Sequence, residues 1–315
     1  MTVTELAPNV SSRHGADSPA VRTLGLTKWY GSTRGIEELD LDVRRGEVLG
    51  LLGPNGAGKT TTIRLLLDLI RPTLGRAEVF GLDVREHSVE VRRRLGYLPG
   101  ELFLPGRLTG RELLNHLADL RGGIRRHAAD RLAERFGLDL DRRITELSKG
   151  NRQKLGVVQA FQHEPQLYIL DEPTSGLDPL VQHHFHHLIE EVVTGGATVL
   201  LSSHVLSEVQ RMAQRVAIIR SGRLAAIEEV EALHARAVRR MHVRFADVPS
   251  EGDFRAIPGV ENVMLDGPLL SCVVVGEADP LVKMLARHRV LAITSEEPDL
   301  EELFLHLYEE PGDGR

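Results

Sequence analysis

Apolar residues in the first two thirds of the chain gather in short runs that end in polar or glycine-rich segments. The runs Val48–Leu52 and 167–170 have the length and composition of buried strands, and Thr198–Ser203 predicts a third. The apolar positions of residues 63–70 predict a helix close behind the first strand. Strands that alternate with helices are typical of an α/β domain.

The pattern changes after residue 235. The expected elements there are strands at 241–248 and Leu269–Val275, a tight turn at 266–268 and a helix at 280–288. A final helix is expected to carry an apolar stripe made of Leu300, Leu303, Phe304 and Leu307. Such a stripe is more typical of core packing than of a partner groove. We therefore expect a disordered tail over residues 1–20, a main domain over 21–235 and a small α+β accessory domain over 236–311.

Between the first strand and its helix lies the sequence Gly-Pro-Asn-Gly-Ala-Gly-Lys-Thr. Its spacing fits the phosphate-binding loop GxxxxGK[ST], whose backbone N–H groups form a nest for anionic oxygens. Lys59 can reach the β- and γ-phosphates, and the Thr60 hydroxyl can hold Mg²⁺. A glycine turn that caps an ordinary helix is the alternative, but the strand and helix on either side favour nucleotide binding. The expected nucleotide-binding residues are Gly53, Pro54, Asn55, Gly56, Ala57, Gly58, Lys59, Thr60 and Thr61.

Two carboxylates, Asp171 and Glu172, directly follow the strand at 167–170. Ligands of open α/β sheets bind at the carboxyl ends of the strands. In P-loop proteins the first such carboxylate holds Mg²⁺ and a second can orient or deprotonate an attacking water. A pair of helix N-caps before Pro173 is the alternative; it would account for one carboxylate better than for both.

Composition excludes several classes of protein. The 315 residues carry 39 Lys and Arg against 45 Asp and Glu, and the net charge of −6 gives no general attraction to nucleic acid or anionic lipid. No apolar run approaches the ~20 residues that span a bilayer, and residues 1–20 lack the features of a signal peptide. Cys272 is the single cysteine, which fits a reducing compartment. We expect a cytosolic protein with no nucleic-acid partner.

The segment that begins at Leu147, Leu-Ser-Lys-Gly-Asn-Arg-Gln, resembles the LSGGQ signature of ABC ATPases. Together with the two phosphate motifs, it makes the chain resemble the ATP-binding subunit of an ABC transporter over about residues 21–235. The resemblance implies that Ser148 and Gly150 contact the γ-phosphate held by an opposite subunit. Lys149 and Asn151 depart from the family pattern, which has glycine and glutamine there.

The resemblance extends to further positions in the family's order. Tyr30 matches the aromatic residue that stacks on adenine, although a core tyrosine is the alternative. Asp171 matches the Mg²⁺ aspartate, and Glu172 matches the catalytic glutamate. The segment ending in Asp178 is similar to the D-loop SALD, and His204 matches the switch histidine that contacts the γ-phosphate.

One family residue is missing. Relatives carry a glutamine after the strand that corresponds to residues 95–99, where this chain has Gly100 followed by Glu101. That glutamine helps to ligate Mg²⁺, and Glu101 is a candidate substitute.

A histidine-rich segment at 183–187 suggests a metal site, because His183 and His187 would share one helix face. Two imidazoles without a carboxylate or thiolate nearby make an incomplete zinc site. We therefore expect an exposed helix.

The family implies an α/β P-loop NTPase fold, namely an ABC cassette with a mixed sheet and a helical subdomain, followed here by the accessory domain. It also implies ATP hydrolysis with Mg²⁺, catalysis by Lys59, Glu172 and His204, and a head-to-tail homodimer or heterodimer whose closure drives a separately encoded membrane permease. The segment that begins at Asp299 is similar to the end of ATPase subunits from ABC-2-type exporters of drugs, lipids or polysaccharides. The expected location is the cytoplasmic face of the membrane.

The sequence supports two other functional classes less well than an ABC transporter subunit. A soluble ABC ATPase acting on ribosomes or chromosomes would usually have two cassettes or a long coiled coil, whereas residues 60–147 leave no room for such an insertion. A GTPase or small-molecule kinase would leave the signature unexplained, and no NKxD guanine motif is present. The transported substrate is not encoded in these motifs.

Overall fold

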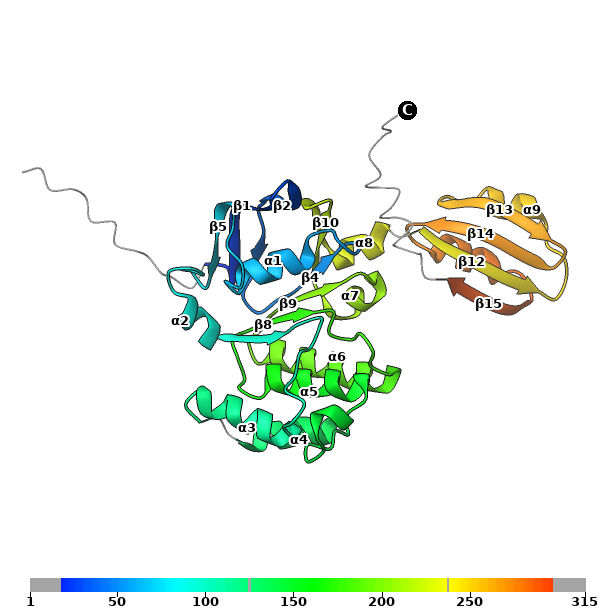
Figure 1. Cartoon of the computed structure of the whole chain (residues 1–315). Coiled ribbons are helices and arrows are strands. Elements are labelled where there is room, and N and C mark those ends of the chain that lie inside the picture. Colours follow the sequence, from blue (N-terminus) through cyan, green and yellow to red (C-terminus); the bar gives the residue numbers. More distant parts are fainter. Residues whose placement is uncertain (1–17, 124–125, 237, 297–315) are drawn as a thin grey trace, which may run out of the picture. The chain divides into compact units, whose positions relative to one another are not determined.

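The computed structural model describes residues 18–123, 126–236 and 238–296 (Figure 1). Its contacts divide the chain into two compact units that meet in sequence between Ile227 and Glu228. The boundary expected after residue 235 falls inside helix α8 (Val230–Arg236). Residues 1–17 of the expected tail and the expected final helix lie outside the described residues.

The first unit contains a six-stranded sheet in the order β11-β10-β4-β9-β8-β7. Its strands are β4 (Val48–Leu52), β7 (Leu95–Leu98), β8 (Leu167–Asp171), β9 (Thr198–Ser203), β10 (Arg215–Arg220) and β11 (Arg223–Glu229). The strands from β10 to β7 run parallel, so that their carboxyl ends meet at one edge. Every residue of β4, β8 and β9 is buried, which confirms the interpretation of their apolar runs as central strands.

A second, antiparallel sheet lies on the side of α1 and shares its core with the parallel sheet. It consists of β1 (Val21–Tyr30), β2 (Thr33–Leu39), β3 (Asp42–Val43), β5 (Leu74–Val79) and β6 (Leu82–Asp83). Helix α1 (Lys59–Leu66) contacts this sheet through β2 and β5 and the parallel sheet through β8. Its apolar face, including Ile63, shares one core with residues of both sheets.

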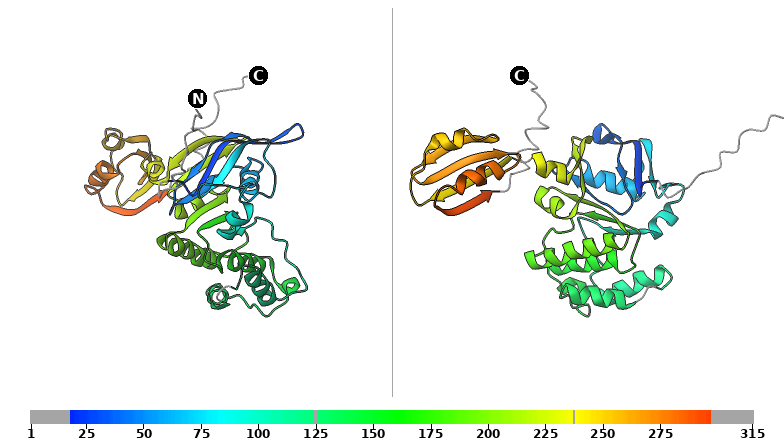
Figure 2. Two further views of the ribbon diagram at one scale, coloured as in Figure 1. Left: turned by 90° about the vertical axis from the view of Figure 1, so that its left-hand side faces the viewer. Right: turned by 180° about the vertical axis from the view of Figure 1, so that it is seen from behind.

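Helices complete the first unit on the far side of the parallel sheet (Figures 1 and 2). They are α3 (Gly110–Leu120), α4 (Arg126–Arg135), the 3₁₀ turn η1 (Ile144–Glu146), α5 (Lys149–Phe161), α6 (Pro179–Thr194) and α7 (Leu206–Met212). Helix α2 (Ser88–Arg93) lies on the side of α1 instead, because its Val91 belongs to the core that α1 shares with both sheets. Helices α5, α6 and α7 pack on strands of the sheet, whereas α3 and α4 pack on α5. The unit is thus an α/β domain with a mixed set of sheets and a helical layer, as predicted.

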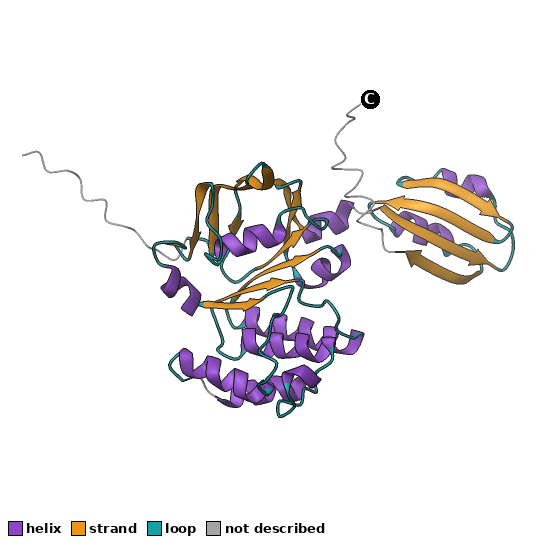
Figure 3. Cartoon of the chain, in the orientation of Figure 1, coloured by secondary structure: helices purple, strands orange, loops and turns teal. Residues whose placement is uncertain are grey.

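The second unit, after α8, has the order β-α-β-β-α-β. Its elements are β12 (Val238–Phe245), α9 (Glu251–Arg255), β13 (Val260–Asp266), β14 (Leu269–Val275), α10 (Asp279–Leu285) and β15 (Val290–Glu296). The strands form an antiparallel sheet in the order β13-β14-β12-β15, and both helices cover one face of it (Figure 3). The predicted strand Leu269–Val275 is confirmed, while β12 begins and ends three residues earlier than expected.

No helix in the described ranges is both long enough and apolar enough to cross a bilayer.

Candidate nucleotide site

The loop from Gly53 to Gly58 joins the end of β4 to the start of α1. Gly58 has φ +114°, and a methyl group there would lie 2.6 Å from Ile36 Cγ2 and 2.9 Å from the carbonyl oxygen of Gly35. A methyl group on Gly53 would lie 2.3 Å from the carbonyl oxygen of Ile219. The two glycines of the phosphate-loop pattern are therefore required by backbone conformation and by close packing.

The Lys59 side chain turns back into this loop and is only 6% exposed. Its ammonium group donates to the carbonyl oxygens of Gly53 at 2.5 Å and Pro54 at 3.3 Å, and it lies 3.7 Å from Glu172 Oε1. Burial lowers the pKa of the Lys59 ammonium, and the carboxylates of Glu172 and Asp171 oppose that effect. A desolvated cation with carboxylates beside it is well placed to neutralise incoming phosphate charge.

Asp171 lies buried at the carboxyl end of β8. The Thr60 hydroxyl donates to its Oδ2 atom at 2.9 Å, and the Ser202 hydroxyl of the neighbouring strand β9 donates to its Oδ1 atom. A hydroxyl and a carboxylate held together in this way fit Mg²⁺, which takes few protein oxygens and completes its octahedron with phosphate oxygens and waters. No group of three or more His, Cys, Asp and Glu residues suited to a metal occurs in the described ranges.

Glu172 adopts a left-handed backbone conformation, with φ +49°. Such strain in a residue other than glycine persists where surrounding contacts hold it, and the backbone N–H of Glu172 donates to the carbonyl oxygen of Ser202 at 3.1 Å. The conformation directs its carboxylate toward His204, whose Nδ1 atom lies 2.9 Å from Glu172 Oε2. Two loops, one after β8 and one after β9, thus bring a candidate base and the histidine into contact.

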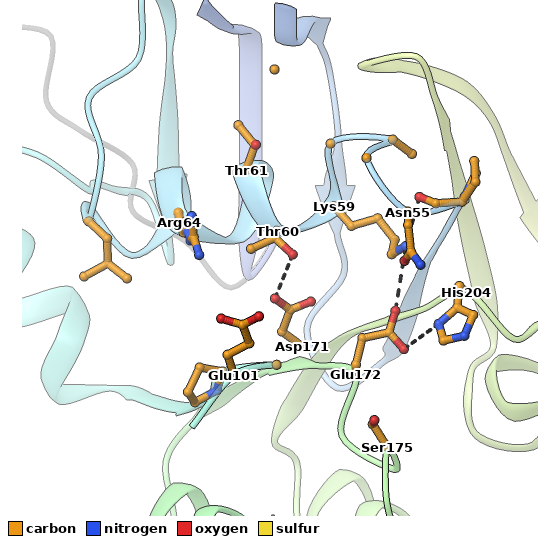
Figure 4. A pocket seen from close by; sticks show the side chains of 18 of the residues that line it. Asn55, Lys59, Thr60, Thr61, Arg64, Glu101, Asp171, Glu172, Ser175 and His204 are labelled. Atoms are coloured by element: carbon orange, nitrogen blue, oxygen red, sulfur yellow. Dashed lines mark hydrogen bonds and ion pairs between the residues drawn. The ribbon is translucent and has the colours of Figure 1, made fainter. Parts of the chain in front are cut away.

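These groups surround one cavity of about 860 Å³ (Figure 4). Tyr30 lies at its wall and is half exposed. Of the residues expected to bind nucleotide, metal or water, the lining includes Tyr30, Pro54, Asn55, Gly56, Ala57, Gly58, Lys59, Thr60, Thr61, Glu101, Asp171, Glu172 and His204. The structure therefore brings together groups that belong to five separate segments of the sequence.

Four expected residues do not line this cavity: Gly53, at the start of the phosphate loop, and three residues outside that loop. Ser148 caps the N-terminus of α5, where its hydroxyl oxygen accepts from the Asn151 N–H at 3.2 Å. Asp178 caps α6 by accepting from the Val181 N–H at 3.0 Å. Gly150 packs against the loop before α6, where a methyl group on it would lie 3.0 Å from the Gly176 carbonyl oxygen.

The neighbouring signature position 149 carries a side chain that lies against the same loop at ordinary contact distance. The stem of Lys149 runs beside Gly176, and a methyl group on Gly176 would lie 3.6 Å from Lys149 Cε. The departure at 149 is therefore compatible with the packing that makes Gly150 a glycine.

The missing family glutamine corresponds to Gly100, which lies against Asp171. A methyl group on Gly100 would lie 3.5 Å from the Asp171 carboxyl carbon. The next residue, Glu101, directs its carboxylate into the cavity on the side of Asp171 and Arg64 (Figure 4).

Several lining residues were not expected from the sequence. They are Arg34, Gly35, Arg64, Leu69, Tyr97, Pro99 and Phe103, whereas Ser175, which also lines the cavity, belongs to the segment similar to the D-loop. Burial raises the pKa of the Tyr97 hydroxyl, with the Asp171 charge acting in the same direction. None of these positions belongs to a spacing pattern, so only the fold reveals them.

The histidine-rich segment lies on α6, and the structure corrects two points about it. The segment is not uniformly exposed, because Phe185 is fully buried and His186 is half-buried. A carboxylate is also present: Glu190 Oε2 lies 3.0 Å from His187 Nδ1, while His187 Nε2 lies 3.1 Å from His183 Nε2. This chain of hydrogen bonds accounts for the cluster without a metal.

Comparison with known proteins gives consistent matches. The family model described as ABC transporter matches residues 36–175. The bacitracin transport ATP-binding protein BcrA of Bacillus licheniformis is 36% identical over 302 residues, which cover 92% of this chain and 97% of that protein. The daunorubicin resistance ATP-binding protein DrrA3 of Streptomyces coeruleorubidus is 36% identical over 301 residues, covering 91% and 95% respectively.

Solved structures give the same result for the fold. A structure described as the ATP-binding subunit of an ABC transporter is 32% identical and superimposes with a TM-score of 0.64, covering 68% of this chain and 92% of that one. A 21% identical ATP-binding cassette bound to ADP and Pi superimposes with a TM-score of 0.62, over 67% of this chain and 98% of that one.

Proposed function

Because this chain belongs to the family of ABC transporter ATP-binding proteins, we propose that it powers an ABC-2-type exporter by ATP-driven closure of a head-to-tail dimer. Residues 21–235 form the ATP-binding cassette in this proposal, and residues 236–311 form the accessory domain. The observation that carries it is the contact between Glu172 and His204 beside Lys59 and the Thr60–Asp171 pair, all in one cavity.

The proposed reaction is in-line attack of water on the γ-phosphate of ATP. Glu172 orients the water and takes its proton, and His204 holds Glu172 and contacts the γ-phosphate. Lys59 and the N–H groups of the phosphate loop stabilise the negative charge that develops. Mg²⁺, held by Thr60 and Asp171 with Glu101 as a further candidate ligand, would supply additional positive charge to the β- and γ-phosphates.

The remaining binding residues have complementary roles. Tyr30 stacks on the adenine ring, and Gly53 to Thr61 surround the phosphates. Ser148 and Gly150 serve the ATP held by a second subunit, and Asp178 lies at the interface between the subunits. Two observations support these roles. Ser148, Gly150 and Asp178 do not line the cavity of their own chain. The N-terminus of α5 has no acidic residue in its first turn, so it favours an anionic phosphate group. The second subunit is another copy or a near relative.

The proposed partner is an integral membrane permease encoded separately, with this chain at the cytoplasmic face of the membrane. In this proposal the segment from Gly100 to Leu104 and the helices before Ser148 couple the cassette to the permease, and the Phe103 side chain in that segment is 89% exposed. Export is supported by relatives named for bacitracin transport and daunorubicin resistance. A drug-like, lipid or polysaccharide cargo would be selected by the permease.

Affinity purification from detergent-solubilised membranes tests the transport assignment. We expect a polytopic membrane protein to co-purify with the chain and to stimulate its ATP hydrolysis. Repeated recovery of ribosomes alone would instead favour a soluble ABC ATPase.

A further inference from the structure

Glu208, on helix α7, lies between the two loops that carry Glu172 and His204. A single carboxylate oxygen, Oε2, accepts a hydrogen bond from the Thr174 hydroxyl at 2.8 Å and another from the Ser203 hydroxyl at 3.0 Å. Thr174 follows Glu172 by two residues, and Ser203 directly precedes His204. One side chain therefore connects the loop after β8 to the loop after β9.

Both hydroxyl groups belong to buried residues. Thr174 is 2% exposed and Ser203 is 1% exposed, so each hydroxyl depends on an acceptor inside the protein. Both hydrogen bonds are partly buried, and a hydrogen bond to a charged group is stronger than one between neutral groups, so it fixes the position of its donor more firmly. The Glu208 carboxylate therefore fixes the spacing between the two loops.

A simpler role for Glu208 is to support its own helix. Ser203 Oγ also accepts from the N–H of Val205, which directly precedes α7, at 3.0 Å, so the bond between Ser203 and Glu208 connects the first turn of α7 to the end of β9. That role accounts for the bond to Ser203 but not for the bond to Thr174, which lies 34 residues earlier on a different loop.

We propose that Glu208 is a positioning residue for ATP hydrolysis: through Thr174 and Ser203 it holds Glu172 and His204 at hydrogen-bonding distance. The inference rests on the proposed ATPase function and extends it to a residue outside the cavity lining. Glu208 does not line the cavity, so we expect it to act on the rate of the chemical step and not on nucleotide affinity.

The test breaks the connection at Thr174, because Thr174→Val keeps the side chain's shape and leaves Glu208 paired with Ser203. We expect kcat to fall by about tenfold, since a small displacement of a catalytic group is costly, while KM and ATP affinity stay within about twofold. Thr174→Ser keeps the hydroxyl and should restore most of the rate. In a His204→Ala background, Thr174→Val should cause little further loss, because both changes act on the same contact.

Thr23→Val is the matched control. Thr23 is also 2% exposed and its hydroxyl donates to the Leu39 carbonyl oxygen at 2.7 Å, but it lies in the antiparallel sheet. Because Thr23 Oγ1 also accepts from the Leu41 N–H at 2.8 Å, the control should lower the melting temperature at least as much as Thr174→Val, without lowering kcat. If the parent protein is active and Thr174→Val leaves kcat unchanged, the proposal for Glu208 is wrong. It is also wrong if Thr23→Val lowers kcat as much as Thr174→Val does. Either result leaves the proposed ATPase function intact. A parent that hydrolyses no ATP, with or without its membrane partner, would overturn both proposals.

Discussion

The two units bury different kinds of side chain. Among the described residues, every buried polar or charged side chain lies in the first unit, whereas the core of the second consists of apolar residues and Cys272. Several of the buried polar groups, such as Lys59, Asp171 and Ser202, follow or end the central parallel strands. Burial of such groups is costly unless they are paired, and they are retained where a site needs them. The buried polar groups of the candidate site therefore all lie in the first unit.

The largest effect expected within the first unit is that of Glu172→Gln. The amide keeps the shape of the side chain but cannot take a proton from water, so kcat should fall by roughly 10² to 10⁴ while ATP binding is preserved. Single-turnover hydrolysis together with equilibrium ATP binding measures both quantities. Near-normal turnover would mean that Glu172 has another task.

Truncation of a core side chain in the second unit should lower the stability of that unit and leave ATP binding unchanged. Phe254, on α9, is fully buried with its ring centroid 5.7 Å from that of Phe245 on β12, so Phe254→Ala should destabilise that unit by about 3–5 kcal/mol. The thiol of Cys272 reports on the opening of this core, because it is buried and burial raises its pKa. We expect faster thiol labelling of the variant with unchanged ATP affinity. Loss of ATP binding would contradict the division of labour between the units.

The smallest expected effect is a pH dependence of the free energy of unfolding of the first unit. Burial lowers the pKa of His163 to about 4, and its Nε2 atom lies 2.8 Å from the Leu95 carbonyl oxygen. Between pH about 6.5 and 4 the unfolded chain binds a proton that the folded chain does not, so the free energy of unfolding should fall as the pH drops through this range. Urea unfolding at several pH values should show a weaker decline for His163→Gln. An identical decline would assign the acid sensitivity to other groups.

The sequence predicted those elements of the fold whose residues form a recognisable pattern within one short stretch of the chain. Strands β4, β8 and β9 were recognisable because both of their faces are buried and their apolar runs are continuous. Strands β13 and β15 were not, because β13 carries an irregular pairing between Glu261 and Met264 and β15 lies at a sheet edge with Leu291 and Ile293 exposed.

The residues of the candidate site also fall into those that the sequence indicates and those that only the fold reveals. Residue order sufficed to indicate Lys59, Asp171, Glu172 and His204, because each follows a recognisable strand or glycine loop. Glu208 could not be found in that way, since its partner Thr174 lies 34 residues away and the pair has no spacing pattern. Contacts between loops depend on the packing of α7 against the sheet, which is a property of the whole unit.

The central claim is that each ATP lies between the phosphate loop of one subunit and Ser148 of another, and mixing two inactive variants tests it most directly. In a head-to-tail dimer of Glu172→Gln with Ser148→Arg, both defects fall in one site and the other site is intact. Random pairing should then restore roughly a quarter of the parental ATPase rate, since half of the dimers are mixed and each has one working site. A mixture no more active than its two components, under conditions where mixed dimers form, would contradict the account.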